Sequence, residues 1–315
     1  MTGFDRLLRC RFAVLLFAIP GLAQRPSTLE TTVELHPDSA SDLVKLAVSL
    51  LKTGQPGQAA GYLDRALRIL GEAPEAAYPH YLRAKVYTDT NDVPKAEGEL
   101  SKAVTLEPEF AAAWSDLGQA RKSLLNAAGA FAAFKRAVEL DPEDSIARYR
   151  LGAAYLDRAE PRLAIPQFEK ALSVAPDDQS SLYSLQRALR EDGQTERADA
   201  VKRRLAETLR RHDIAAQNAL KAVVVNNEGA ALQKNGDLPA AREKYRAALE
   251  LYPENVPIRV NLAIALLRTG QWSEGLSQLR EAMRRDPLND LLKRAWNDAA
   301  SQAPPGTTVD GARLR

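Results

Sequence analysis

Two overlapping motifs could indicate chemistry in this sequence. Ser49 to Gly54, SLLKTG, combines S-x-x-K with K-T-G, which are signatures of penicillin-binding enzymes. Those enzymes carry the two motifs on separate elements beside a cleft. Here both fall at the end of one predicted helix, so we predict no acyl-transfer site. Gly54, Gly57 and Gly61 lack the preceding strand that a phosphate-binding loop requires.

The histidines and acidic pairs do not form a ligand site either. His36, His80 and His212 share no metal-ligand spacing, and we expect each to be an ordinary polar residue of the surface or of a turn. The acidic pairs in PED (142–144) and PDD (176–178) could suggest calcium, but their place before a predicted helix favours N-caps. We therefore predict no catalytic, cofactor-binding or metal-binding residues.

The composition of the 315 residues favours helices. It is 45% hydrophobic but only 6% aromatic, and Ala, Leu, Arg and Glu are prominent. Alternating Val, Ile and Thr segments bounded by glycine turns are missing from the sequence, so we predict an all-α fold without a substantial sheet.

The segment 1–23 is typical of a secretory signal peptide. Basic residues precede an apolar run from Phe12 to Ile19, and Gly21 and Ala23 occupy the −3 and −1 places of a cleavage site after Ala23. The run is shorter than the roughly 20 apolar residues of a membrane span, so we expect none in the mature protein. Cys10 precedes the run, which argues against a lipid anchor. We expect a periplasmic or secreted protein.

Cleavage there would change the charge and the cysteine content. Loss of Arg6, Arg9, Arg11 and Asp5 from 43 basic and 41 acidic residues leaves 40 of each. A neutral chain has no bulk electrostatic attraction to nucleic acid or anionic membrane. The only cysteine, Cys10, is also removed, so disulfide and thiolate chemistry are excluded.

A 34-residue period organises the rest of the chain. Pro108, Pro142 and Pro176 follow one another at this spacing, and so do Pro253 and Pro287. Within each period, two apolar helical stripes flank a short polar turn. Small residues allow the two helices to approach, and one such hairpin must stack on neighbours to bury its apolar face.

Marks inside the period carry a family resemblance. Residues 111–144 contain these marks in order: Trp114, Leu117, Gly118, Ala130, Phe134, Ala137 and Pro142. Arg121 stands where a second aromatic residue is usual. The pattern resembles the tetratricopeptide repeat family over about residues 40–289. The resemblance implies a right-handed superhelical α-solenoid of stacked helix-turn-helix repeats.

The period gives the predicted organisation. We assign 1–23 to the signal peptide, 24–39 to a flexible lead and 40–178 to four repeats (40–76, 77–110, 111–144 and 145–178). Residues 179–221 form a degenerate repeat with a long helix, and 222–289 form two further repeats. Residues 290–303 form a capping helix and 304–315 a disordered tail.

One gap breaks the period. The interval from Pro176 to Pro253 is longer than two full periods, and Gln186 and Lys202 replace the expected glycine and aromatic residue of the repeat between them. No Gly or Pro lies between Gly193 and Gly229. Two interpretations remain: a drifted repeat with a few added turns, or a rigid spacer whose charged face is free for a partner.

The resemblance also implies a binding surface, because first helices line the concave groove in this family. The fifth and ninth places of each repeat should face that groove. Three tyrosines recur there, interleaved with polar residues, which suits a peptide with apolar anchors and an acidic group. The alternative is that some of these tyrosines only pack between first helices. The predicted groove residues are Tyr81, Lys85, Ser115, Gln119, Tyr149, Tyr183, Arg187 and Asn226.

We therefore predict a non-enzymatic scaffold or adaptor of the bacterial cell envelope that binds peptide or helical segments. The alternative function is a substrate-binding accessory subunit that holds a peptide or polysaccharide for a partner enzyme. No cofactor is implied. Trp114 is the one tryptophan that could stack on a sugar, and its place favours packing between helices.

Overall fold

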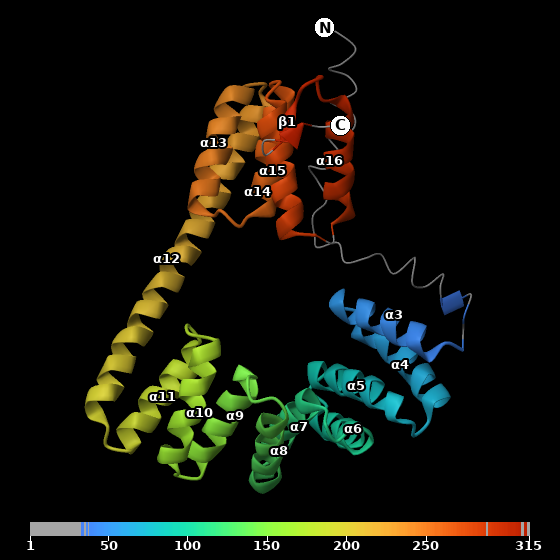
Figure 1. The fold of residues 1–315 in the computed structure, drawn as a ribbon, viewed down its shortest axis with the longest axis vertical. Helices are drawn as coiled ribbons and strands as arrows, with labels where there is room; N and C mark the ends of the chain where they lie inside the picture. Colours follow the sequence, from blue (N-terminus) through green and yellow to red (C-terminus); the bar gives the residue numbers. More distant parts are fainter. Residues whose placement is uncertain (1–32, 35, 37, 288, 310–311, 314–315) are drawn as a thin grey trace. The chain divides into compact units, whose positions relative to one another are not determined.

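The computed structural model describes residues 33–34, 36, 38–287, 289–309 and 312–313. The predicted signal peptide lies outside them. These residues divide into two compact units, the N-terminal unit within residues 25–210 and the C-terminal unit within residues 211–315. The described part contains 14 α-helices, so the all-α fold of stacked helical repeats is confirmed (Figure 1). None of the described helices combines the length and the apolar character needed to cross a bilayer.

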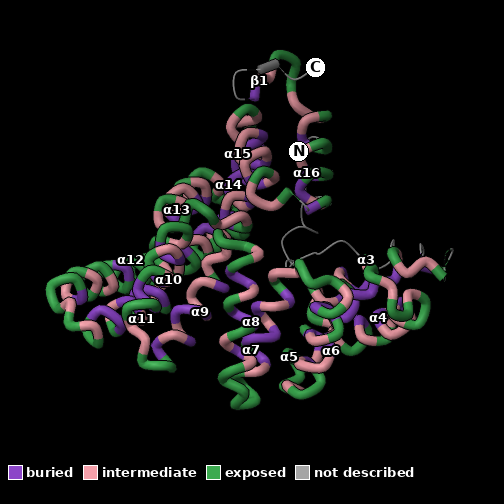
Figure 2. Tube along the Cα trace, turned by 60° about the horizontal axis from the view of Figure 1, so that its bottom comes forward, coloured by how far each residue is buried: buried purple, intermediate pink, exposed green. Residues whose placement is uncertain are grey.

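The N-terminal unit is a series of helical hairpins, each of which packs on the next. Its helices are α3 (Ala40–Lys52), α4 (Pro56–Leu70), α5 (Ala77–Asp89), α6 (Val93–Leu106), α7 (Ala111–Ser123), α8 (Ala127–Leu140), α9 (Ser145–Asp157), α10 (Pro161–Val174) and α11 (Gln179–Glu191), with the 3-10 turn η2 (Pro74–Ala76) before α5. Figure 2 shows that buried residues recur in hairpin after hairpin instead of gathering in one centre. The core is therefore a continuous layer between helices.

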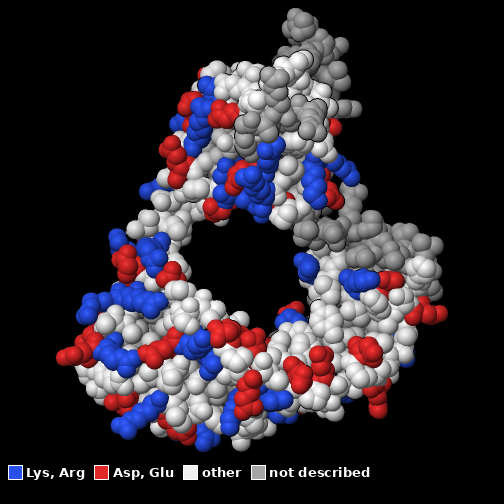
Figure 3. Space-filling model, in the orientation of Figure 1, with Lys and Arg blue, Asp and Glu red and all other residues white. Residues whose placement is uncertain are grey.

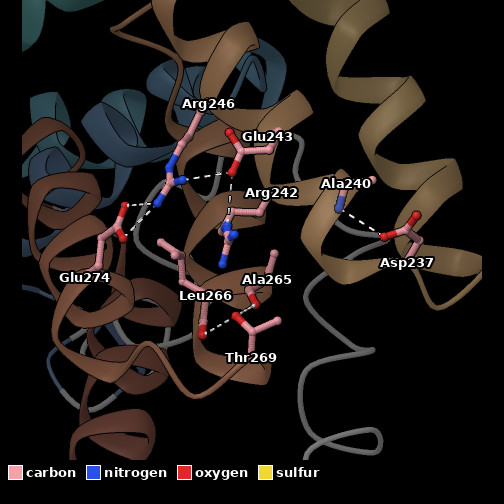
Figure 4. Close-up of polar contacts among 9 residues, drawn as sticks. All are labelled: Asp237, Ala240, Arg242, Glu243, Arg246, Ala265, Leu266, Thr269 and Glu274. Atoms are coloured by element: carbon pink, nitrogen blue, oxygen red, sulfur yellow. Dashed lines mark hydrogen bonds and ion pairs between the residues drawn. The ribbon is translucent and has the colours of Figure 1, made fainter.

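The long helix α12 (Thr195–Lys234) begins in the N-terminal unit and ends in the C-terminal unit. The C-terminal unit continues with α13 (Leu238–Leu251), α14 (Val256–Arg268), α15 (Trp272–Arg285), α16 (Asp290–Gln302) and the strands β1 (Thr308–Val309) and β2 (Ala312–Arg313). Arg246 on α13 donates to both carboxylate oxygens of Glu274 on α15, at 2.8 and 2.9 Å, and its guanidinium also contacts Glu243 (Figure 4). This contact joins the second helices of two neighbouring repeats.

The turn inside every repeat has the same backbone. We number each repeat from Ala40, Ala77, Ala111, Ser145, Gln179, Ala222 and Val256. Position 15 then always has a positive φ, and its residues are Gly54, Asn91, Leu125, Ala159, Gly193, Gly236 and Gly270. Glycine adopts this conformation freely, whereas Leu125 (φ 61°) and Ala159 (φ 56°) adopt it against their steric preference.

Close approach of the two helices explains the glycine at position 8. A Cβ added to Gly118 would lie 2.5 Å from the ring of Phe134, at position 24 of the same repeat. The corresponding distance from Gly152 to Phe168 is 2.7 Å. Both rings are fully buried, and each fills the space that a Cβ on the glycine would otherwise occupy.

The acidic residues after the prolines cap the next helix, as predicted. Asp144 accepts hydrogen bonds from the backbone N–H groups of Ile146 and Ala147, at 2.8 and 3.1 Å. Asp178 accepts one from Ser181 N at 2.7 Å. These carboxylates satisfy N–H groups that a helix start leaves unpaired.

The two predicted flexible ends differ from the structure where it describes them. Val33 is buried in the apolar cluster of α3 and α4. Thr308 and Val309 pair with Arg313 and Ala312 in a short antiparallel hairpin, and Val309 is 1% exposed against α15 and α16. The prediction of a disordered tail is therefore wrong for these strands, because a single valine anchors them to the core.

Candidate functional site

First helices of neighbouring repeats lie side by side in the N-terminal unit. α3 contacts α5, α7 contacts α9, and α9 contacts α11. Side chains join them directly: Lys122 on α7 donates to Asp157 on α9 at 2.6 Å. The first helices therefore present one continuous surface, as the repeat pattern predicts.

A polar network crosses three of these helices. Lys85 Nζ on α5 lies 3.8 Å from Asp116 Oδ2 on α7. Arg150 Nη1 on α9 donates to Asp116 Oδ1 at 2.9 Å and to Ser115 Oγ at 2.7 Å. Partial burial opposes the charge of Lys85, but Tyr81 and Asp116 outweigh it and raise the pKa of Lys85. One carboxylate therefore holds two cations beside each other.

This network forms part of the wall of a pocket of about 240 Å³. Its lining residues are Lys85, Thr88, Asp89, Val93, Ala96, Asp116, Gln119, Ala120, Ser123 and Arg150. Two predicted groove residues, Lys85 and Gln119, are thus brought to one cavity. Ser115 was also predicted to face the groove, but it is 3% exposed and acts by accepting the hydrogen bond from Arg150.

An aromatic cluster adjoins the network. The rings of Tyr81 and Phe110 are 4.9 Å apart, and Tyr78 stacks on Tyr81 at 6.3 Å. Lys85 Nζ lies 5.2 Å from the centre of the Tyr81 ring. Burial, followed by the charge of Asp116, raises the pKa of the Tyr81 hydroxyl. Tyr81 therefore packs between repeats, while Tyr78 keeps 44% of its surface exposed.

The other two predicted tyrosines differ from each other. Tyr149 is half-buried, with its ring 5.9 Å from that of Phe168, so it has the packing role considered as the alternative. Tyr183 on α11 is 63% exposed. One turn further along the same helix, Arg187 is exposed and donates to Glu191 at 2.7 Å. Tyr183 and Arg187 are available to a ligand.

Asn226 lies in the C-terminal unit and accepts a hydrogen bond from Asn261 Nδ2 on α14 at 3.0 Å. The groove positions of α14, Val260 and Ile264, are each 3% exposed. The first helices of this unit are therefore not an equivalent open surface.

Asp116, Arg150 and Phe110 were not predicted from the sequence. Asp116 and Arg150 occupy position 6 of adjacent repeats, one period apart, and carry opposite charges. A comparison of that position between adjacent repeats could have found the pair. Charges of both signs are interspersed over the visible face of the N-terminal unit (Figure 3).

The sequence predicted His80 to be a residue of the surface or of a turn, and this prediction is wrong. His80 is 9% exposed, and its Nδ1 lies 2.6 Å from Glu99 Oε2. Burial opposes ionisation of Glu99, but hydrogen bonds and charges from His80 and Lys102 outweigh it and hold the pKa of Glu99 below its usual value. The pair joins α5 to α6. Within the described residues, no three potential metal ligands gather at one place.

The motif SLLKTG lies at the end of α3, where Thr53 Oγ1 donates to the carbonyls of Ser49 and Leu50. The side chain of Trp114 donates to the carbonyl of Pro108 at 2.9 Å and packs against two apolar clusters. Thr53 thus satisfies carbonyl groups at the end of α3, and Trp114 has the packing role that its place in the repeat predicted.

Comparison with known proteins agrees with this architecture. Models of the tetratricopeptide repeat match residues 44–109, 81–145, 146–178 and 232–295. The chain belongs to the tetratricopeptide repeat family. Proteins built from these repeats act in general as scaffolds for protein–protein interaction, and the fold assigns this chain to that class.

Solved structures share the fold at low identity. A double mutant of MamA RS-1 is 21% identical, and the alignment covers 55% of this chain and 96% of that one with a TM-score of 0.50. A tetratricopeptide repeat protein from Parabacteroides merdae is 12% identical, and the alignment covers 83% of this chain and 98% of that one with a TM-score of 0.48. YrrB, described as having an unusual peptide-binding site, is 18% identical, and the alignment covers 75% of this chain and 97% of that one with a TM-score of 0.38. No curated protein matches the sequence.

Proposed function

We propose that this chain is a non-enzymatic scaffold of the bacterial cell envelope that binds a peptide or helical segment along the first helices of its N-terminal unit. The observation that carries the proposal is the pocket between α5 and α7, where Lys85 and Gln119 meet across two repeats. A pocket of this size suits one or two side chains of a peptide and not a whole small domain.

The surface also favours a particular kind of peptide. Asp89 and Asp116 together balance the charges of Lys85 and Arg150 in the pocket wall, so the pocket offers hydrogen bonds more than net charge. Tyr78 at the start of α5 and Tyr183 on α11 supply exposed aromatic area on the same row of helices. A segment with two apolar anchors and a polar group between them fits this order.

A displayed library of random peptides tests the proposal. Peptides selected on the wild-type protein should lose at least about tenfold in affinity, roughly 1.4 kcal/mol, with Lys85→Ala/Gln119→Ala and with Tyr183→Ala. Tyr149 is unsuitable because its replacement would also remove core packing. Tyr252→Ala, at a tyrosine of the C-terminal unit that is 37% exposed, is the matched control. Equal binding of the peptides by all four proteins would refute the proposal that peptides bind along the first helices.

The place of action rests on the sequence alone. Basic residues, a short apolar run and a small-residue cleavage site support export through a signal peptide. Protein recovered from the periplasm or the medium of a bacterial host should begin at Gln24. Recovery of an uncleaved chain from the cytoplasm would contradict export.

A further inference from the structure

Regular junctions between repeats share one set of contacts. In the junction from α8 to α9, Phe134, Ala137 and Val138 pack with Ala147 and Leu151, and none of these is more than 8% exposed. They occupy positions 24, 27 and 28 of one repeat and positions 3 and 7 of the next. The junction from α6 to α7 uses Leu100, Ala103, Val104, Ala113 and Leu117 at the same five positions.

The junction from the fifth to the sixth repeat lacks these contacts. Its equivalent positions all lie in α12, because that helix supplies the second helix of one repeat and the first helix of the next. Val224, at position 3, is 58% exposed, whereas Ala113 and Ala147 at that position are fully buried. Ala206, at position 28, is also exposed.

Helix geometry prevents α12 from making the contact with itself. Leu205 and Val224 are about 28 Å apart along a continuous helix at roughly 1.5 Å per residue. Leu205, at position 27, is partly buried in the core of its own unit, but Ala206 and Val224 are exposed. Each compact unit therefore ends, at α12, in a repeat face that its own residues leave partly uncovered. One face carries positions 24, 27 and 28 of the fifth repeat, and the other carries positions 3 and 7 of the sixth. In the regular junctions these two sets of positions pack on each other.

Four exposed apolar residues of α12 lie on one stripe, whereas Ile214, 43% exposed, lies on the other side of the helix. Leu209, Ala216, Leu220 and Val223 follow spacings of seven, four and three, which place them on one side of a helix. Leu209 is 46% exposed, Leu220 70% and Val223 48%. From Leu209 to Lys221 no residue is buried.

We propose that a second copy of this chain covers the stripe. The two α12 helices pair in antiparallel orientation, so residues 202–209 of each copy pack on residues 223–231 of the other. Each copy thereby supplies the missing repeat junction of its partner. The interface is isologous, and its two-fold axis passes near Ala216, whose small side chain permits close approach.

The charges support this register. Lys202 occupies position 24, where regular repeats have Phe134 or Phe168, and Glu228 occupies position 7, where they have Leu151 or Leu185. These positions face each other across a regular junction, so an apolar contact is replaced by opposite charges. Both side chains remain at the surface, and Glu228 also accepts from Lys244 at 2.7 Å. An antiparallel pairing that joins Lys202 to Glu228 also places Leu209 within one helical turn of Val223.

Sedimentation of the full chain gives the first test. The wild-type protein should sediment as a dimer whose fraction falls on dilution. Leu220→Lys should weaken association at least tenfold with an unchanged helical signal, since lysine is a good helix former and Leu220 is mostly exposed. Leu125→Lys, at a leucine that is 92% exposed in the turn between α7 and α8, should remain dimeric. A wild-type protein that is monomeric at every concentration would overturn the proposal.

Cysteine cross-linking tests orientation and register. In a Cys10→Ser background, oxidation should link two chains through Ala216→Cys but not through Asn218→Cys, which lies on the opposite side of the helix. Leu209→Cys and Val223→Cys should cross-link when the two variants are mixed but not when either is alone. A chain that carries both and closes an internal disulfide as a monomer would show instead that α12 bends and completes its own junction.

Discussion

At the scale of single residues, the size of the side chain at position 8 of a repeat is matched to the size of the side chain at position 24. Glycine faces an aromatic ring in three repeats, as in Gly118 with Phe134. Alanine faces leucine in the others that keep the pattern. The pairs are Gly118–Phe134, Gly152–Phe168, Gly229–Tyr245, Ala47–Leu63, Ala84–Leu100 and Ala263–Leu279. The total volume at each crossing is thus kept nearly constant.

This pairing predicts strong coupling between the two positions. Gly118→Ala should lower the free energy of unfolding by about 2 kcal/mol, because the new Cβ would overlap the Phe134 ring. Gly118→Ala/Phe134→Leu should be more stable than the sum of the two single changes predicts, since it recreates the Ala84–Leu100 pair. Urea unfolding of the four proteins measures the coupling, and strictly additive effects would contradict it.

Residue-level features were predictable only where the period exposes them. The glycines of close approach and the capping acids follow from repeated positions. Leu125 and Ala159 do not, because the common turn forces a positive φ on residues that avoid it. The burial of His80 does not follow from the period either, because its partner Glu99 lies on the next helix and the pair forms only when α5 and α6 pack together.

At the scale of elements, α12 illustrates what an absence of helix breakers can and cannot predict. The stretch without Gly or Pro between Gly193 and Gly229 favours a long helix, which we expected within residues 179–221. The helix nevertheless continues past Gly229 to Lys234. The reason is packing: a Cβ on Gly229 would lie 2.8 Å from Tyr245, so this glycine makes room for a ring inside a helix and does not end it.

Proteolysis can test whether α12 stays continuous in solution. Arg210, Arg211 and Lys221 are tryptic sites within it, and a helix protects its backbone from a protease that needs an extended strand. Trypsin should cut the wild-type chain slowly there. Gln217→Pro should speed cleavage at least tenfold, whereas Gln217→Ala should not. Early cleavage of the wild-type chain between residues 205 and 222 would exclude a rigid helix.

At the scale of the whole molecule, a repeat array needs a closed end. The C-terminal unit is closed by α16 and β1, where Leu292, Ala299 and Val309 pack on Leu276 and Leu279 of α15. The capping helix was predictable from its amphipathic pattern. The hairpin was not, because two-residue strands carry too little pattern.

Removal of this end should affect one unit. A chain that stops after Asp286 should lose at least about 10 °C in the unfolding transition of the C-terminal unit, since the apolar side of α15 becomes exposed. The transition of the N-terminal unit should not move. Calorimetry measures both transitions, and a chain that ends at Val309 is the control. An unchanged C-terminal transition would show that α16 contributes no stability.

The candidate site was predictable in outline. The fifth and ninth places lie on the first helices, where Lys85, Gln119, Tyr183 and Arg187 are exposed. That this row binds a peptide stays a prediction. Position in the repeat does not distinguish Tyr183 from Tyr149, because the exposure of each side chain depends on the neighbouring repeat. Asp116 lies at position 6, outside these two places.

The pairing of positions 8 and 24 also restricts how such a gene can be reshuffled. A recombination event whose crossover falls between these positions would join a glycine to a leucine, leaving a void, or an alanine to an aromatic ring, causing a clash. Crossovers between hairpins keep each pair intact. Chimeras of these repeats should therefore survive as exchanges of whole hairpins, and the heritable module of this array is the hairpin and not the single helix.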